Sequence, residues 1–194
     1  TRYEILTNEV MFDYIVSNTL YSKQGQQAFN GDADFPISVV ADNVHASQKI
    51  VDGTQGSMMI KAAWKVIGSN DDPSKFHTTD AYVYDNPNEN AGVQAACELQ
   101  TVGLVGFHIG TKTDGSPQWA WSTFEQVNNV PTQGESLKDT HYNYYSANCG
   151  QDCTDVNSPP VRPWDPAIPY TQPSQIERVI PIDSATKALN KRYQ

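Results

Sequence analysis

Alternation of apolar and polar residues predicts β-strands through the middle of the chain. The pattern is clearest over residues 57–67, where Trp64 falls on the apolar face and lysines fall on the other. Similar patterns predict further strands at residues 78–85, 101–111 and 118–127. The strand at 101–111 is apolar on both faces, which is typical of a central strand. We therefore expect a sheet that has Trp64 in its core.

A turn signal joins the last two of these strands. Residues 113–117 read Thr-Asp-Gly-Ser-Pro, and Asp, Gly and Pro favour the backbone angles of tight turns. Two strands joined by so short a connection pair side by side in opposite directions. The segment therefore predicts an antiparallel hairpin.

The segments on either side of these strands are predicted to form helices, short strands and a long loop. Apolar residues at helical spacing predict a helix over residues 8–29, and a short helix is expected at 184–193. Short strands are expected at 35–40, on a sheet edge, and at 177–182. Residues 131–173 hold too many prolines for a helix or a central strand. The expected fold class is α+β: an antiparallel β-sheet with an N-terminal helix, a short C-terminal helix and a long Pro/Tyr-rich loop.

Composition narrows the class of protein. The chain has 194 residues and a net charge of −9, and this length fits a single domain over 1–194. Its acidity argues against nucleic-acid binding, because phosphate backbones are also negative, and no apolar run is long enough to span a bilayer. Asn, Gln, Ser and Thr replace many charged residues, which suits a secreted or periplasmic protein. No signal peptide is recognisable, so we expect a processed piece of a longer extracytoplasmic protein.

The cysteines indicate whether the protein resides in an oxidising compartment. There are three of them, Cys97, Cys149 and Cys153, so at least one stays unpaired within the chain. Cys149 and Cys153 lie in a loop rich in Gly, Asn and Asp, where close pairing is sterically possible. The alternative pairing joins Cys97 to one of them. Either disulfide would indicate an oxidising compartment.

The sequence contains no motif for a cofactor. It has no Gly-rich nucleotide motif, no phosphate loop and no CxxCH haem-attachment motif. The Cys149-x3-Cys153 pair lacks the second ligand pair of a structural zinc site. The Asn/Asp-rich turns at 70–72 and 85–90 do not have EF-hand spacing. We therefore expect no bound cofactor and no metal.

One pair of residues is a candidate for catalysis. His108 lies in the expected central strand, and Glu125 lies on the neighbouring strand of the hairpin, which also carries Ser122. A histidine and a carboxylate near a hydroxyl are groups that hydrolases use. The alternative interpretation is a buried, hydrogen-bonded histidine of the sheet beside a structural carboxylate.

Aromatic residues are the other candidates for function. Tyr142, Tyr144 and Tyr145 lie in the long loop, and Trp119 and Trp121 lie in the fourth predicted strand. Rings among neutral polar residues suit stacking on sugars, whereas tryptophans on the inner face of a sheet pack into the core. The candidate partners are therefore carbohydrate or another protein chain.

Three segments resemble a group of uncharacterised secreted bacterial proteins that are loosely labelled "cytochrome c family". The likeness covers about residues 57–131 and is carried by 59–66, 102–109 and 117–131, with a weaker likeness at 176–182. The resemblance implies secretion and a larger parent protein. In that group the haem motif lies beyond the region that this chain represents. The resemblance therefore brings neither haem nor catalytic residues to this chain.

Three hypotheses of function follow. The leading one is a non-catalytic binding or structural domain of a secreted or surface protein, because no catalytic constellation is recognisable and the long loop is rich in aromatic residues. The first alternative is a secreted hydrolase that uses His108 and Glu125. The second alternative is a haem- or redox-associated module, which only the resemblance implies.

Overall fold

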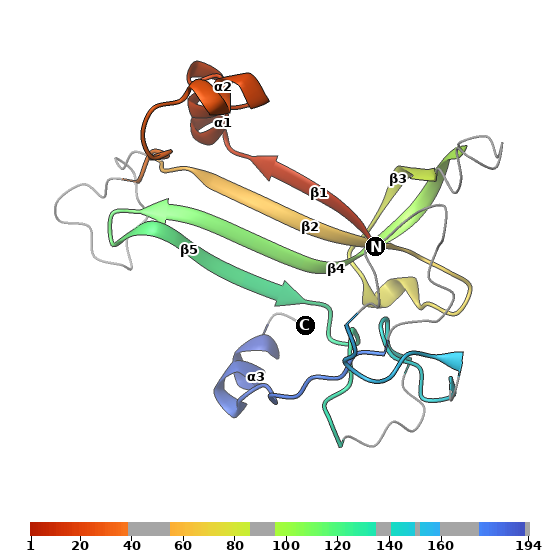
Figure 1. The fold of residues 1–194 in the computed structure, drawn as a ribbon. Helices are drawn as coiled ribbons and strands as arrows, with labels where there is room; N and C mark the ends of the chain where they lie inside the picture. The colour runs from red at the N-terminus through yellow and green to blue at the C-terminus, as the bar shows by residue number, and fades with distance from the viewer. Residues whose placement is uncertain (39–54, 86–95, 135–140, 150–151, 160–174, 193–194) are drawn as a thin grey trace. The chain divides into compact units, whose positions relative to one another are not determined.

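The computed structural model of the chain divides into two compact units (Figure 1). Unit 1 comprises Thr1–Val66 and Val102–Glu125, and unit 2 comprises Ile67–Thr101 and Gln126–Gln194. The single domain expected over the whole chain stays a prediction. The residues that the structure describes are 1–38, 55–85, 96–134, 141–149, 152–159 and 175–192.

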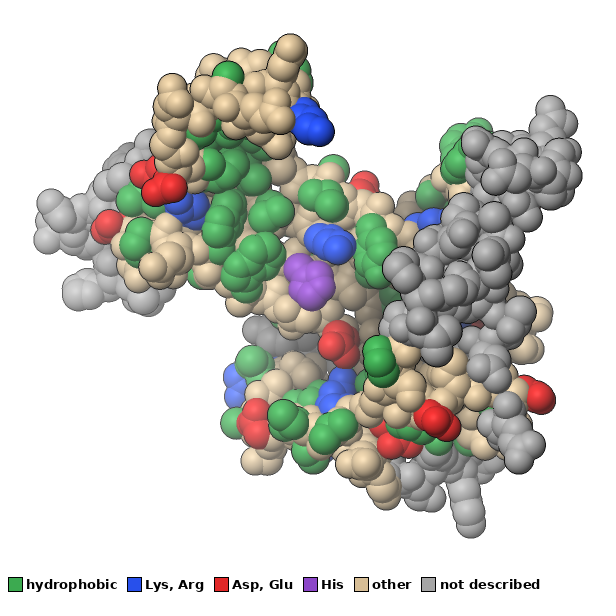
Figure 2. Space-filling view, in the orientation of Figure 1, with side chains coloured by type: hydrophobic (Ala, Val, Ile, Leu, Met, Phe, Trp, Pro, Cys, Tyr) green, Lys and Arg blue, Asp and Glu red, His purple; other side chains and the backbone are tan. Residues whose placement is uncertain are grey.

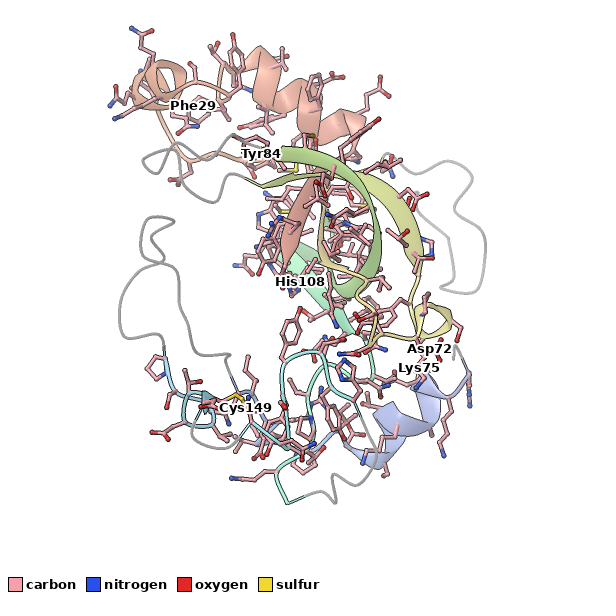
Figure 3. All side chains as sticks on the ribbon, turned by 90° about the vertical axis from the view of Figure 1, so that its right-hand side faces the viewer. Phe29, Asp72, Lys75, Tyr84, His108 and Cys149 are labelled. Atoms are coloured by element: carbon pink, nitrogen blue, oxygen red, sulfur yellow. A yellow bond between two sulfur atoms is a disulfide. The ribbon has the colours of Figure 1, made fainter. Side chains whose placement is uncertain are left out.

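A curled antiparallel sheet of five strands is the main element of the fold, which confirms the α+β class (Figures 1 and 3). The strand order is β1-β2-β4-β3, and β5 pairs with β4. The strands are β1 (Arg2–Thr7), β2 (Met58–Val66), β3 (Thr78–Asp85), β4 (Ala96–Thr113) and β5 (Ser116–Glu125). The hairpin predicted around residues 113–117 is confirmed, because β4 and β5 pair antiparallel on either side of that turn.

The first strand was not predicted, and the helix expected at 8–29 is wrong in its extent. The segment forms β1 and then two helices, α1 (Glu9–Ser17) and α2 (Lys23–Ala28). Between the helices, Thr19 adopts a positive φ of 59°, and the Ser22 side chain caps the second helix. Gly25 allows the close approach, because a Cβ there would collide with the Thr19 carbonyl.

The predictions for the C-terminal region are confirmed only in part. Helix α3 (Ser184–Asn190) forms where a helix was expected. The strand predicted at 177–182 is wrong, because Arg178 makes only an isolated bridge to Thr132. The edge strand expected at 35–40 is likewise a single bridge, between Ser38 and Thr113, in its described part. Residues 39–40 and much of the expected long loop lie outside the described residues.

Aspartates cap two short helical segments in unit 2. The Asp183 carboxylate accepts hydrogen bonds from the N–H groups of Ala185 and Thr186 and from the Thr186 hydroxyl. Hydrogen bonds from Thr186 lower the pKa of Asp183 below its usual range. Asp72 caps the 3₁₀ helix η1 (Pro73–Lys75), and hydrogen bonds from Ser74 lower its pKa in the same way. Both caps therefore stay ionised at neutral pH.

Side chains in unit 1 alternate between two faces of the sheet. One row across the sheet joins Ala62, Phe107 and Phe124, and we call the face that carries it the Phe face. A row on the opposite face joins Met59, Gly110 and Trp121, and we call that side the Trp face. The pairing shifts at Ala63/Trp64, where the sheet has a bulge.

Few apolar residues are buried among those that the structure describes. Unit 1 buries Met11, Ala62, Val102 and Val105, and unit 2 buries Val83 and Tyr142. Trp64, which was expected in the core, is only half-buried, because it lies beside the exposed edge strand β1, opposite Arg2, and its Nε1 donates to Glu4 Oε2 at 3.2 Å.

The Asn8 side chain fastens the first strand and helix to the sheet. Its Oδ1 accepts from the N–H of Met11, which caps α1, and from the N–H of Met58 at the start of β2. Its Nδ2 donates to the carbonyl of Gly56 at 2.9 Å, and its backbone N–H donates to the Met58 carbonyl. One half-buried side chain thus fixes the point at which the chain leaves β1 and α1 begins.

We predict that Asn8→Ala lowers the free energy of unfolding by about 2 kcal/mol, because a helix cap and a part-buried hydrogen bond are lost together. Asn8→Asp keeps the acceptor oxygen and loses the bond to Gly56, so it is expected to cost less. Urea denaturation followed by far-UV circular dichroism measures both. Asn30→Ala, an exposed position in the same unit, is the control. Equal stability of Asn8→Ala and Asn30→Ala would contradict the assignment.

Candidate functional site

Four aromatic rings from three parts of the chain meet on the Trp face. Tyr14 of α1 contacts Phe35, with ring centroids 4.8 Å apart, and Phe35 contacts Trp119 of β5 at 5.9 Å. Trp119 and Trp121 lie 6.1 Å apart at alternate positions of the same strand. Tyr14, Phe35 and Trp119 are half-buried, whereas the Trp121 side chain is 57% exposed. The sheet edge therefore carries a ring platform that remains open at Trp121.

Gly110 of β4 makes room for the open end of this platform. A Cβ built at Gly110 would lie 3.1 Å from the Cζ3 and Cη2 atoms of the Trp121 ring, which is tighter than ordinary contact. The six-membered ring of the indole therefore lies against the Gly110 backbone. Glycine at a strand position often marks such a close approach.

A buried lysine holds the segment that carries Phe35. The Lys112 side chain is 8% exposed, and its Nζ forms an ion pair with Asp34 Oδ1 at 3.0 Å. The backbone of Ser38 bonds to Lys112 and Asp114, and the backbone of Ser57 bonds to Pro36 and Lys112. These bonds keep Phe35 beside Trp119, the residue opposite Lys112 in the sheet.

A polar row borders the aromatic platform on the same face. Lys61, His108 and Thr123 lie opposite one another on β2, β4 and β5. His108 Nδ1 is 2.9 Å from the Thr123 hydroxyl, and the Lys61 ammonium lies 4.5 Å from the centre of the Tyr3 ring. Figure 2 shows histidine and lysine side chains beside hydrophobic ones on this side, and Figure 3 marks His108 on the sheet. The platform thus has hydrogen-bonding neighbours.

The two catalytic candidates, His108 and Glu125, lie on the same face of the sheet but not directly opposite each other. Glu125 lies opposite Gly106, one same-face position along from His108 and Thr123. Ser122 pairs with Ile109 and therefore points to the Phe face, away from His108. The hydroxyl at His108 belongs to Thr123, which sequence reasoning did not single out.

The tyrosine tract belongs to unit 2 and is largely packed. Tyr142 is 8% exposed and meets Tyr145 edge to face at 6.4 Å, while Tyr144 and Tyr145 are half-buried. The backbone of Tyr144 bonds to Asn129 and to Ile176. Ligand binding by this tract stays a prediction, and Tyr144 and Tyr145 offer the larger part of its accessible ring surface.

Unit 2 also contains a histidine–carboxylate pair that the sequence did not reveal. His141 Nε2 lies 3.3 Å from Asp71 Oδ1, and Asp71 Oδ2 accepts from the Gly68 N–H at 2.8 Å. The Asp71 side chain is 4% exposed and that of His141 57%. The residues are 70 positions apart, so no local pattern could have joined them. Among the described residues, no three His, Cys, Asp or Glu side chains group to hold a metal ion.

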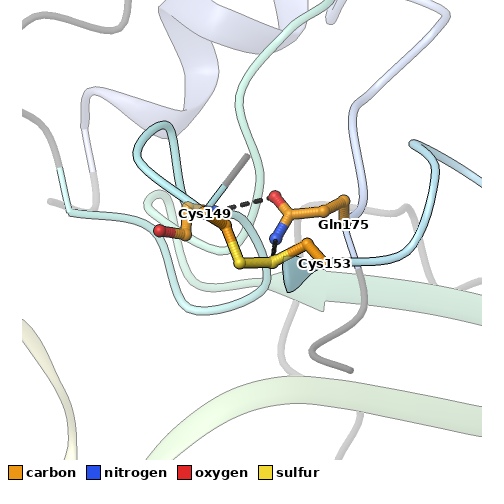
Figure 4. Close-up of a disulfide and its surroundings, with 4 residues drawn as sticks. Cys149, Cys153 and Gln175 are labelled. Atoms are coloured by element: carbon orange, nitrogen blue, oxygen red, sulfur yellow. Dashed lines mark hydrogen bonds between the residues drawn. A yellow bond between two sulfur atoms is a disulfide. The ribbon is translucent and has the colours of Figure 1, made fainter. Parts of the chain in front are cut away.

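Of the two pairings that the sequence left open, the structure has the disulfide between Cys149 and Cys153, and Cys97 is a free, exposed cysteine (Figure 4). Gln175 lies against this loop. Its side-chain oxygen accepts from the Ser146 N–H, and its Nε2 lies 2.7 Å from Cys153 Sγ. The disulfide and Gln175 together hold the loop to the segment before α3.

No helix within the described ranges is both long and apolar enough to cross a membrane. Comparisons of the chain with protein-family models, curated proteins and solved structures found no match.

We predict that Gly110→Ala displaces the Trp121 ring, because the added methyl group meets it at 3.1 Å. The near-UV circular dichroism and tryptophan fluorescence of the folded protein are expected to change. Gly106→Ala on the same strand is the matched control, since its methyl group meets only the Ala63 methyl, at 3.4 Å. Identical spectra for the two variants would contradict the position of Trp121.

We predict one disulfide and one free thiol in the isolated protein, with Cys97 the alkylated residue in non-reducing peptide mapping. The double variant Cys149→Ser/Cys153→Ser should lose roughly 2 kcal/mol of stability, the chain-entropy value for so short a loop. Cys97→Ser should leave stability nearly unchanged. A disulfide that includes Cys97 in freshly isolated protein would contradict the pairing.

Proposed function

We propose that this chain is a non-catalytic binding domain of a secreted or surface protein, and that the Trp face of unit 1 binds neutral carbohydrate. The observation that carries the proposal is Trp121, a tryptophan that is 57% exposed and whose six-membered ring lies against Gly110. An indole fixed in this way loses little conformational freedom on binding, so its apolar area is available at low entropic cost.

The neighbours of Trp121 supply what a sugar ring requires. Sugar rings have apolar C–H faces and a rim of hydroxyl groups, so they suit a flat ring with donors and acceptors beside it. Thr123 and His108 lie in the adjacent cross-strand row, and Lys61 completes that row. A small number of polar groups beside an aromatic surface is the usual composition of a ligand site.

The net charge favours a neutral ligand over an anionic one. The chain carries −9 at neutral pH, so an anionic polymer is repelled over most approaches. The Cys149–Cys153 disulfide supports the extracytoplasmic part of the proposal, because such bonds persist in oxidising compartments.

The hydrolase hypothesis has weaker support on the same face. It requires a carboxylate to orient His108, and Glu125 is offset from His108 along the strand. The hydroxyl group beside His108 is a hydrogen-bond partner at 2.9 Å, which equally suits a structural role. Binding without catalysis uses the same residues and needs no further group.

We predict that Trp121→Ala weakens binding to a neutral polysaccharide by about 30-fold, the size of a 2 kcal/mol hot spot. The probes are soluble β-glucan, α-glucan and mannan, measured by calorimetry and by retardation in affinity gels. Phe124→Ala is the matched control, because Phe124 is 57% exposed on the Phe face of the same strand.

Two outcomes would overturn this proposal. One is wild-type protein that binds none of the three polysaccharides. The other is an equal loss of binding in Phe124→Ala, which would move the site away from the Trp face.

A further inference from the structure

The outer edge of β1 has features of a strand that pairs with another chain. β1 is at the end of the strand order and has β2 as its neighbour in the sheet. All six of its residues are exposed, including Tyr3 at 65% and Ile5 at 60%. Sheet edges in monomeric proteins are usually protected by lysine, proline, bulges or a covering segment. β1 contains no proline, its pairing with β2 is regular, and its two charged side chains, Arg2 and Glu4, are opposite in sign.

The direction of the backbone groups shows which residues would form the new bonds. Asn8 donates its N–H to Met58, across from it on β2. Backbone groups alternate along an antiparallel strand, so Leu6, Glu4 and Arg2 also point toward β2. Tyr3 and Ile5 therefore point their N–H and carbonyl groups to the open edge.

Charge selects one register for a second copy of the same chain. A two-fold axis perpendicular to the sheet can centre the pair on Tyr3, Glu4 or Ile5. Centring on Glu4 opposes two carboxylates, and centring on Ile5 sets Glu4 against a leucine. Centring on Tyr3 sets Arg2 opposite Glu4 of the partner subunit twice and pairs the two tyrosine rings. Opposite charges and aromatic pairs across strands stabilise a sheet.

We propose that two copies of this chain associate through β1, paired antiparallel about Tyr3, with each Arg2 facing Glu4 of the partner subunit. The contact extends the sheet of unit 1 across both copies. Because the strand is short, the buried area is below that of a standard stable interface, and the dimer is therefore concentration-dependent. This association is independent of the carbohydrate proposal.

A charge-swap cycle tests the contact by sedimentation velocity over a wide concentration series. All proteins carry Cys97→Ser, which removes the exposed thiol as a source of crosslinks. Arg2→Glu and Glu4→Arg should each reduce the dimer fraction, and the double variant should restore it. Lys23→Glu, an exposed charge reversal on α2, should have no effect. A Cys97→Ser parent chain that is monomeric at every concentration, or a double variant no better than the single ones, would overturn the proposal.

Crosslinking tests the register separately. Single cysteines at positions 3, 4 and 5, again with Cys97→Ser, are oxidised and separated without reductant. A two-fold axis at Tyr3 brings only the residue-3 pair within disulfide range, so Tyr3→Cys should give the highest yield of dimer. A higher yield from Glu4→Cys or Ile5→Cys would overturn the register. Circular dichroism of each variant confirms that it is folded.

Discussion

The hydrogen bonds of Asn8 are the constraint on which the candidate site depends. They join the end of β1, the first turn of α1 and the start of β2 in one place. The position of α1 determines where Tyr14 lies, and Tyr14 contacts Phe35, which in turn contacts Trp119. A side chain with no direct contact to the exposed indole thus helps to arrange the platform around it, because each ring is placed by the one before.

Gly110 and Lys112, both on β4, also determine the positions of the aromatic rings. Gly110 lacks the side chain that would displace Trp121, while the buried Lys112 side chain forms an ion pair with the exposed Asp34. A buried lysine is costly unless its charge is paired. The pair therefore couples the position of the 34–38 segment to the sheet, and the aromatic cluster is held by electrostatics on one side and by close packing on the other.

Sequence patterns predicted the parts of this fold that depend on local chemistry. The strand from Met58 to Val66, the turn at Asp114-Gly115 and the Asp183-capped helix each have a signal within a few residues. The half-buried state of Trp64 had no such signal, because it depends on the exposed edge strand β1 beside it, which the sequence did not predict. The single helix expected at 8–29 failed because positive φ at Thr19 overrides helical spacing. Trp119 and Trp121 were recognised as candidates, but their partner Phe35 and the role of Gly110 depend on pairing between distant segments, as does the contact of His141 with Asp71.

If two copies pair through β1 and the Trp face binds polysaccharide, as proposed above, the open edge of β1 has a consequence for the strength of binding. A two-fold axis perpendicular to the sheet leaves the Trp faces of both copies on the same side of the extended sheet. A polysaccharide is a repeating ligand, so a chain long enough to reach both indoles would be held at two points. The second contact forms at the effective concentration that the first one sets, and the resulting avidity can exceed either single affinity by orders of magnitude. Weak sites on a small sheet would then suffice to retain a long polymer, while short oligosaccharides would dissociate freely.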